Sequence, residues 1–330
     1  MQPFGFNVVS GNREEGTPIA IAGQVMVDIQ NLLTDIGRCI VRSEMWLQNE
    51  IPPEIIDKFT LRIGGSSKKG LGSNVSKGSE ALMEDALKVL FETLNYLGRG
   101  ASAIWMQDKF NDPFERSAIA RDLVALNDHL SGNVLIYGPT NDQREFRGLD
   151  RDKILQFVKS GAEKWAVIGK VSSDPRYKGH WNLVNSENPV PLSFSKRAPK
   201  NLVDRAAGSG IVSVVGFVSR NADGKVLSIN NVESFIEYSE AVFYRIITPE
   251  RVVPLGAPLK VKVSYSAGTG MWTMAHGDLG IDVSKPSWDE CVIALHKQFV
   301  LHYESYVETE KEFTGADKEA KALFLTYLPS

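Results

Sequence analysis

The sequence predicts a multidomain α+β protein, and three observations carry this prediction. A chain of 330 residues is long for a single hydrophobic core. Helical periodicity dominates the first 138 residues, whereas short segments with period-two alternation follow from residue 206. Two short strand patterns then precede a long amphipathic helix. We expect an N-terminal α/β layer domain at 1–138, a basic connecting region at 139–205, a β-rich domain at 206–265 and a β-β-α module with a further helix at 266–330.

Composition and cysteine usage place the chain among ordinary globular proteins. Hydrophobic residues make up 43% and charged residues 23%, and a formal net charge of −3 excludes a global basic field for nucleic acid. Cys39 and Cys291 lie in apolar helical patterns, which favours two buried, reduced thiols. The N-terminal residues lack a signal-peptide pattern and no run reaches membrane-spanning length, so we expect a cytoplasmic protein.

The first domain alternates helical and strand patterns. The helix predicted at Ile21–Arg42 repeats apolar residues at three- and four-residue steps, as a core-facing helix does. A second helix is expected to begin after Ser79 and to end near Gly98, where glycine favours a C-cap. The other expected elements are strands at Phe6–Val9, Phe59–Ile63 and Val134–Tyr137 and a helix at Arg116–Leu130.

Gly65–Gly70 has the glycine spacing of the first half of a phosphate-binding loop. Such a loop needs Lys and then Ser or Thr after its second glycine, to hold the phosphates and the metal. Leu71 and Gly72 occupy these positions. We therefore favour an exposed contact loop over a nucleotide site.

The connecting region is the basic part of the chain. Between Arg144 and Lys200, twelve Lys and Arg residues outnumber six acidic residues, and aromatic side chains are interleaved with them. This pattern is typical of a surface for single-stranded nucleic acid or phosphates. The candidate nucleic-acid-binding residues are Arg176, Lys178, Trp181, Lys196, Arg197 and Lys200.

A structural interpretation of the same region stays open. The charges can belong to the solvated surface of a helix at Asp152–Gly161 and a strand at Trp165–Val171. Asn185–Pro199 contains three prolines and is expected to be a linker or a surface loop.

From Gly208 onward the pattern changes to strands. Asp223-Gly224 separates two strands at Ile211–Ser219 and Lys225–Ile229, which is a strong hairpin signal. Further strands are expected at Phe235–Tyr238, Val242–Ile247 and Leu259–Tyr265. We expect a meander or a small barrel; an oligonucleotide-binding barrel agrees with the number of strands but has no other support.

The most specific local signal in the sequence is a helix start. Ser287 can act as N-cap, and Glu290, three residues later, can complete a capping box. The helix that follows carries one apolar stripe, formed by Trp288, Cys291, Val292, Leu295, Phe299, Tyr303 and Tyr306. A further helix, opened by Thr314 and Asp317, is expected to extend to Tyr327.

Two strands with period-two alternation are expected before the Ser287 helix, at Met271–His276 and Leu279–Val283, joined by a turn at His276–Asp278. Strand, strand and a helix opened by a capping box resemble HicB-like modules, over roughly residues 270–307. Those modules are small antitoxin domains with a degraded ribonuclease-H-like core. The resemblance implies a role in protein contact, as in antitoxins or accessory subunits of prokaryotic antiviral defence. The family's DNA-binding helix-turn-helix or ribbon does not follow the module in this sequence.

No residue constellation in the sequence identifies a reaction. The five histidines show no metal-ligand spacing, and the common motifs of nucleophilic catalysis are absent. We therefore expect no cofactor and no metal site. Whether the protein is an enzyme stays open, because catalytic residues that meet only in the fold leave no motif.

Three functional hypotheses follow. Residues 271–330 contain ten acidic and five basic residues, so an acidic module follows the basic region. Together with the resemblance, this favours a non-enzymatic interaction protein with a protein partner and no membrane contact. The first alternative is a nucleic-acid-binding protein that uses residues 144–200 for DNA or RNA. The second is a nuclease-like enzyme with an unrecognised site between the first two domains.

Overall fold

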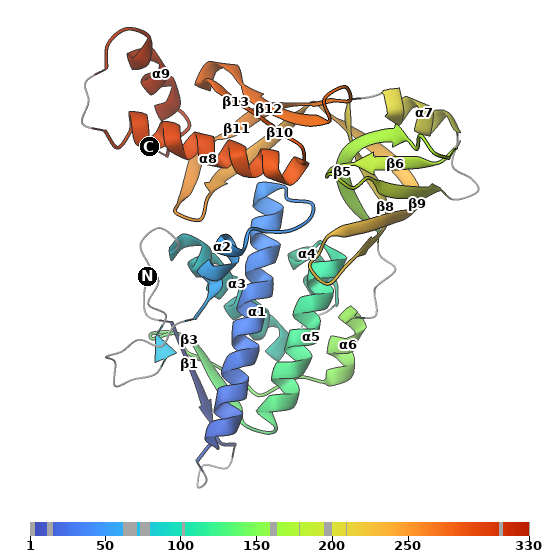
Figure 1. Cartoon of the computed structure of the whole chain (residues 1–330). Coiled ribbons are helices and arrows are strands. Elements are labelled where there is room, and N and C mark those ends of the chain that lie inside the picture. Colours follow the sequence, from blue (N-terminus) through green and yellow to red (C-terminus); the bar gives the residue numbers. More distant parts are fainter. Residues whose placement is uncertain are drawn as a thin grey trace. The chain divides into compact units, whose positions relative to one another are not determined.

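The computed structural model describes residues 4–11, 16–61, 71–72, 80–100, 103–158, 164–177, 179–194, 200–208, 210–309 and 313–329 (Figure 1). The chain forms two compact units, which are described separately below. Unit 1 comprises Met1–Ile40 and Pro52–Glu163, and unit 2 comprises Val41–Ile51 and Lys164–Ser330. Helix α1 (Ile19–Met45) begins in unit 1, and its last residues belong to unit 2. Helices and several sheets occur together, so the predicted α+β multidomain class is confirmed.

Unit 1 contains a four-stranded antiparallel sheet and several helices. The strand order is β2-β1-β3-β4, and β1 pairs with β3 from Phe4 opposite Pro139 to Val9 opposite Val134. The strands are β1 (Phe4–Val9), β2 (Leu71–Gly72), β3 (Val134–Pro139) and β4 (Arg144–Phe146). The helices besides α1 are α2 (Pro53–Ile56), the 3-10 helix η1 (Asp57–Phe59), α3 (Glu80–Gly98), α4 (Ala103–Lys109), α5 (Pro113–Leu130) and α6 (Arg151–Val158).

The helices expected in this unit are confirmed, and their apolar residues form its core. The ring centroid of Phe91 on α3 lies 6.2 Å from that of Phe4 and 5.6 Å from that of Tyr137, so α3 packs on the sheet. The buried residues that the sequence placed on the helix faces are Val25, Ile29, Leu32, Leu33, Ile36, Leu82, Ala86, Leu90, Leu94 and Leu97. β2 lies in the glycine-rich stretch, whose residues 62–70 and 73–79, with the expected cap Ser79, lie outside the described part of the chain.

Helix α5 begins earlier than the sequence pattern indicated. The Oδ1 atom of Asp112 accepts a hydrogen bond from the backbone N–H of Phe114 at 2.9 Å, and Pro113 occupies the first helical position. The helix ends where Ser131 and Gly132 adopt left-handed φ angles of 46° and 84°.

The prediction of a strand at Phe59–Ile63 is wrong for Phe59–Leu61, the part of this range that the structure describes. Phe59 ends the 3-10 helix η1 and is fully buried. Gln30 of α1 binds this segment at two points, because its Nε2 donates to the carbonyl of Phe59 at 3.0 Å and its Oε1 accepts from the N–H of Leu61 at 2.7 Å. Gly37 leaves room on α1 for the Phe59 ring, since a Cβ atom there would overlap it. Packing against α1 therefore decides the backbone conformation of Phe59–Leu61. The period-two alternation that predicted a strand here is not paired with another strand.

The first part of unit 2 is a closed five-stranded barrel. Its elements are β5 (Lys164–Ser173), β6 (Trp181–Val184), β7 (Val190–Phe194), α7 (Lys200–Gly208), β8 (Ile211–Arg220) and β9 (Val226–Tyr238). The closed order is β5-β6-β7-β9-β8; β7 pairs with β9 in parallel and all other pairs are antiparallel. The first strand closes on the fourth, and a helix joins the third to the fourth. This connectivity is that of the oligonucleotide- and oligosaccharide-binding fold.

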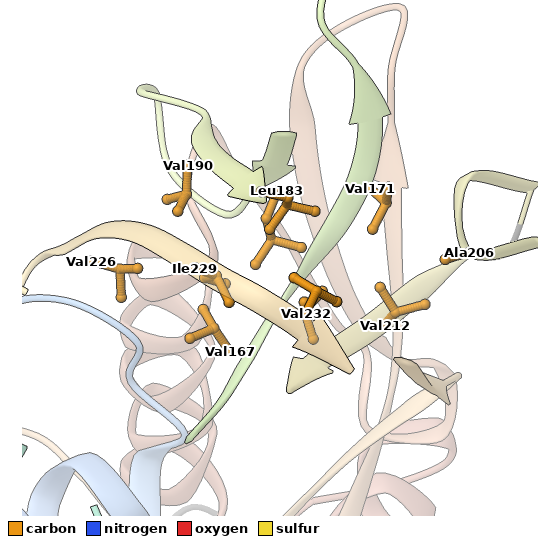
Figure 2. Packing of buried hydrophobic residues seen from close by; sticks show 11 residues of the cluster. Val167, Val171, Leu183, Val190, Ala206, Val212, Val226, Ile229 and Val232 are labelled. Carbon is orange, nitrogen blue, oxygen red and sulfur yellow. The ribbon is translucent and has the colours of Figure 1, made fainter. Parts of the chain in front are cut away.

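The barrel interior is filled by β-branched and aliphatic side chains from all five strands (Figure 2). Its buried members are Val167, Val171, Leu183, Val190, Leu192, Ala206, Val212, Val214, Val226, Ile229 and Val232. Gly169 and Gly216 sit where the strands approach closely, since a Cβ atom at either would overlap a neighbouring side chain. A small barrel filled in this way is a solid core, so ligands can bind only on its outside.

Two expectations about this region are corrected. Asn185–Pro199 is not a linker over its described residues, because β7 contributes Val190 and Leu192 to the barrel core. The three prolines obscured the period-two alternation of that strand. The expected boundary between a connecting region at 139–205 and a β-rich domain also differs from the structure, since the barrel runs across residue 205. The hairpin predicted around Asp223-Gly224 is confirmed as β8 and β9.

The second part of unit 2 is an antiparallel meander covered by a helix. Its strands, in the order of the sheet, are β10 (Glu240–Ile247), β11 (Val252–Ser266), β12 (Met271–His276) and β13 (Ile281–Lys285). The other elements are the 3-10 turn η2 (Gly277–Leu279), α8 (Trp288–Tyr306) and α9 (Ala316–Leu325). Because β11 pairs with β12 from Lys262 opposite Ala275 to Ser266 opposite Met271, the sheet crosses the boundary expected near residue 265.

Helix α8 packs on this sheet and α9 packs on α8. Trp288 of α8 lies 5.3 Å from Trp272 of β12, and Phe299 lies 4.6 Å from Phe324 of α9, measured between ring centroids. The cap expected for the last helix is wrong, because Gly315 occupies the N-cap position and makes no side-chain hydrogen bond. Within the described residues, none of the helices combines the length and the apolar character needed to cross a membrane.

Candidate nucleic-acid interface

The strand register places the barrel loops at two opposite ends of β6. Ser173 pairs with Trp181, so the β5–β6 loop (residues 174–180) lies at the beginning of β6. Leu183 pairs with Val190, so the β6–β7 loop (residues 185–189) lies at its end. The β8–β9 loop (residues 221–225) lies at this second end too, because β9 starts beside the start of parallel β7. We name the 174–180 side the open end and the 185–189 and 221–225 side the closed end.

The loop at the open end is held by hydrogen bonds to Asp174. The side chain of Asp174 accepts from the backbone N–H of Arg176 at 2.8 Å and from Nδ2 of Asn182 at 3.3 Å. The backbone N–H of Asp174 donates to the carbonyl of His180 at 2.8 Å, and that of His180 donates to the carbonyl of Tyr177 at 3.1 Å. The hydrogen bond from the Arg176 N–H contributes most to lowering the pKa of Asp174, which stays a carboxylate.

This loop presents aromatic rings and the Arg176 guanidinium to solvent, and the Nε atom of that guanidinium lies 3.4 Å from Oδ1 of Asp174 in an ion pair. The Tyr177 side chain is 59% exposed, and the Arg176 side chain is 77% exposed. The Arg176 guanidinium lies 5.8 Å from the Tyr177 ring centroid, and the His180 ring lies 5.6 Å from it at an interplanar angle of 52°. Exposed aromatic rings beside a guanidinium are the groups on which unstacked bases stack. We call Arg176, Tyr177 and His180 the open-end tip.

The outward-facing residues of β6 and β7 are uncharged, and Asn182 and Ser193 among them are polar. Ser193 of β7 donates to Oδ1 of Asn230 on β9 at 3.0 Å, and Nδ2 of Asn230 donates to Ser228 at 3.1 Å. The residues of β6 and β7 that lie outside the core and its margin are Asn182, Val184, Pro191 and Ser193. Amide and hydroxyl groups can pair with the edges of bases, whereas they add little attraction for phosphate.

The predicted basic region is divided between the two units. Arg144, Arg147 and Arg151 belong to unit 1, where they pair with Asp142, Glu145 and Asp128. On the barrel, two further cations pair with β9: Lys164 lies 2.7 Å from Glu233, and Arg205 lies 3.2 Å from Glu237. The Nζ atom of Lys170 donates to the carbonyl of Ala207 at 2.9 Å, and burial lowers its pKa. Much of the charge excess is therefore neutralised locally.

The structure places the six candidate residues differently. Arg176 lies in the exposed tip, whereas Trp181 is half-buried and packs against the barrel core, so it is no stacking platform. Lys200 is the first residue of α7. Lys178, Lys196 and Arg197 lie outside the described residues.

Tyr177 and His180 were missing from the candidate set. The available signal was the turn between two strands, in which Gly179 adopts a φ of +83° and flanking aromatic residues cannot reach the core. Identifying this turn required recognition of β6, whose four residues give a weak sequence pattern.

The closed end is covered by residues 46–49, which belong to unit 2. The Gln48 side-chain oxygen accepts from the N–H of Ile168 on β5 at 3.0 Å, and the Asn49 side-chain oxygen accepts from the N–H of Val226 on β9 at 3.2 Å. Arg220 donates to the carbonyl of Gln48 and to that of Gly224, both at 2.6 Å. The side chains of Gln48 and Asn49 thus accept hydrogen bonds from backbone N–H groups of two barrel strands, β5 and β9.

Helix α8 fixes these residues from the other side. The carboxyl group of Asp289 accepts from the backbone N–H groups of Gln48 at 2.7 Å and of Asn49 at 2.8 Å. The N–H of Trp288 donates to the carbonyl of Asn185 in the β6–β7 loop at 2.9 Å, and Asn185 is fully buried. Burial raises the pKa of Asp289. One residue of each loop at the closed end, Asn185 and Gly224, is therefore buried, whereas Glu187–Pro189, Ala222 and Asp223 are exposed.

Residues 270–307, for which the sequence predicts a HicB-like module, bury most of their apolar stripe against their own sheet. The expected cap is present, since the Ser287 hydroxyl accepts from the N–H of Glu290 at 3.2 Å. The buried residues of α8 include Trp288, Cys291 and Leu295. The four-stranded meander extends beyond the two expected strands. The hypothesis of a protein partner for this segment stays a prediction.

The described residues show no grouping of three or more His, Cys, Asp or Glu side chains suited to a metal ion. His296 has a structural role, because its Nδ1 accepts from the N–H of Ile247 at 2.9 Å. Burial lowers its pKa to about 3, so the ring is neutral.

Comparison of the chain with known proteins gives no guide to its function. No family model, curated protein or solved structure matches it. The functional argument therefore rests on the geometry of the barrel.

Proposed function

We propose that the protein binds nucleic acid through the open end of the barrel in unit 2. The observation that carries this proposal is the open-end tip, in which Arg176, Tyr177 and His180 project together from the loop between the first two barrel strands. In barrels with this connectivity, that loop and the second and third strands are the surfaces that bind oligonucleotides or oligosaccharides. The choice of this surface comes from an analogy between folds. The side chains of Arg176, Tyr177 and His180 support it through their own chemistry.

The chemistry of the tip favours nucleic acid over the sugar alternative. The Arg176 guanidinium is exposed beside its partner Asp174 and can contact a phosphate, while Tyr177 and His180 offer ring faces to bases. Asp174 holds the described residues of the loop in this arrangement, because its carboxylate accepts hydrogen bonds from Arg176 in the loop and from Asn182 on β6. A preordered loop loses little conformational entropy on binding.

Fluorescence anisotropy with labelled single-stranded DNA and RNA tests the proposal at low salt. Tyr177→Ala should weaken binding by about tenfold or more, since stacking of one base on an aromatic ring contributes about 1–3 kcal/mol. Tyr244→Ala is the matched control, because Tyr244 on β10 is 68% exposed but lies on the other sheet of unit 2. Equal losses in the two variants, or no binding by the parent protein, would refute the proposal. Binding of an oligosaccharide that Tyr177→Ala abolishes would assign the site to sugars instead.

A further inference from the structure

Unit 1 has a pocket on the face of its sheet opposite α3. Phe91 of α3 packs against Phe4 and Tyr137, and side chains alternate between the two faces along a strand. Val9 and Ile136 therefore point to the other face. A cavity of about 620 Å³ lies there, lined by Val9, Ser10, Gly11, Val134, Ile136, Glu145 and Arg147. Cavities of this size hold small molecules in other proteins.

The floor of this pocket is aliphatic. Val9 lies opposite Val134 in the register of β1 and β3, and Ile136 follows two residues along β3 on the same face. Val134 is buried, whereas Val9 and Ile136 are half-buried, so part of their apolar surface is open to a ligand. Gly11 passes the backbone of Gly132 so closely that a Cβ atom would overlap the Gly132 carbonyl, so only glycine fits in this part of the wall.

The rim of the pocket carries one charge of each sign. Glu145 lies opposite Ile136 in the register of β3 and β4, and Arg147 follows two residues later. The Nη2 atom of Arg147 lies 2.6 Å from Oε2 of Glu145. The Arg147 side chain is 70% exposed and that of Glu145 is 54% exposed. An ion pair this exposed contributes little to stability, so a ligand can open it at low cost.

We propose that this pocket binds a free amino acid with a branched aliphatic side chain. The floor takes the side chain, the Arg147 guanidinium pairs with the α-carboxylate, and the Glu145 carboxylate accepts hydrogen bonds from the α-ammonium group. Both charges of the ligand are attached to one carbon atom, and both charges of the protein lie together at the rim, so one zwitterionic head group can meet both. The site lies in unit 1 and does not depend on the nucleic-acid site in unit 2.

Saturation-transfer NMR and calorimetric titration of the full chain test this site with L-leucine as the probe, which should bind saturably. Glycine should bind at least about tenfold more weakly, because it lacks the side chain that the floor would bury. 4-Methylpentanoate lacks the amine of leucine and 3-methylbutylamine lacks its carboxylate, and each should bind at least about threefold more weakly than leucine. No saturable binding of leucine, or equal binding of leucine and glycine, would overturn the proposal.

Variants at the rim locate the bound molecule. Arg147→Gln should weaken the binding of leucine and of 4-methylpentanoate but not that of 3-methylbutylamine, because it removes only the cation. Glu145→Gln should weaken the binding of leucine and of 3-methylbutylamine but not that of 4-methylpentanoate.

Arg144→Gln is the matched control for Arg147→Gln. Arg144 lies on the same strand, pairs with Asp142 at 2.8 Å and is not among the residues that line the pocket. Its replacement should leave the affinity for leucine unchanged. Equal losses in Arg144→Gln and Arg147→Gln, with unchanged melting temperatures, would show that net charge and not the pocket attracts the ligand, and would overturn the proposal.

Discussion

The carboxyl group of Asp289 accepts the backbone N–H of Gln48 at 2.7 Å, across 241 positions of the sequence. Its second oxygen accepts the N–H of Asn49 at 2.8 Å. Asp289 lies in the first turn of α8, and the side chains of Gln48 and Asn49 bind the barrel. The Asp289 side chain therefore connects helix α8 to the barrel through these two residues. The closed end of the barrel depends on this connection.

Asp289→Ala should lower the free energy of unfolding of unit 2 by about 3 kcal/mol, because two buried N–H groups lose their acceptor. Urea unfolding followed by tryptophan fluorescence measures the change, since Trp272 and Trp288 lie in this part of unit 2. Glu290→Ala is the control, because Glu290 is the adjacent acidic residue and its side chain is exposed. Equal effects of the two substitutions would show that charge at the helix start, and not the hydrogen bonds, is responsible.

The stability of unit 1 should depend on pH through a pair of carboxyl groups. Burial raises the pKa of Asp35 on α1 and of Asp122 on α5, and the two carboxyl groups interact with each other. Burial first, and the charge of Asp35 second, raise the pKa of Asp122 from its usual value of 3.8 to about 7. Arg38, Arg121 and Asp28 are the other charged groups that act on this pair.

The sign follows from proton binding. Between about pH 4 and about pH 7 the folded chain keeps a proton that the unfolded chain has lost, so stability falls as pH rises through this range. Asp122→Asn should remove this slope, and the difference between the two unfolding curves cancels other titrating groups. Asp128→Asn on the same helix should leave the slope unchanged, because the Asp128 side chain is 42% exposed. A parent curve with the same slope as Asp122→Asn would contradict the assignment.

The two cysteines should differ in reactivity. Cys291 is fully buried, and burial raises the pKa of its thiol to about 12, so it should resist thiol reagents until unit 2 unfolds. Cys39 is half-buried, which corrects the expectation of two buried thiols. We expect one thiol to react in the native protein and two in urea. Cys39→Ser should abolish the native reaction, and persistence of that reaction would assign it to Cys291.

The proposed interface should show a modest dependence on salt. The barrel wall beside the tip is uncharged, so phosphate contacts come from the loop cations alone. On a single strand, Arg176→Gln should reduce the slope of log affinity against log salt by about 0.7, the value for one phosphate contact. Lys225→Gln should leave the slope unchanged. A slope that does not respond to Arg176→Gln would show that this guanidinium does not contact phosphate.

Local patterns predicted the elements that are long or capped. The stripe of α1, the stripe of α3, the Ser287 cap and the Asp223-Gly224 hairpin all appear where the sequence placed them. Each of these signals joins residues that are neighbours along the chain. The prediction failed at Phe59, where a helix distant in sequence decides the conformation.

The candidate site was predicted only in part. Arg176 was found because charge is visible in composition, and Trp181 was included because any tryptophan near cations resembles a stacking platform. The structure turns Trp181 toward the core and Tyr177 outward. Which face a side chain takes depends on strand register, and in a strand of four residues the sequence specifies register weakly.

The sequence by itself determined the α+β class, the main helices and the hairpin, because these depend on short-range periodicity and capping. Only the tertiary structure decided that β7 lies parallel to β9 and closes a barrel, since that pairing joins segments separated by a helix and another strand. It also decided that residues 46–49 cover the closed end. Each of these contacts joins a side chain to a backbone group far away in the sequence, so no pattern of neighbouring residues predicts it.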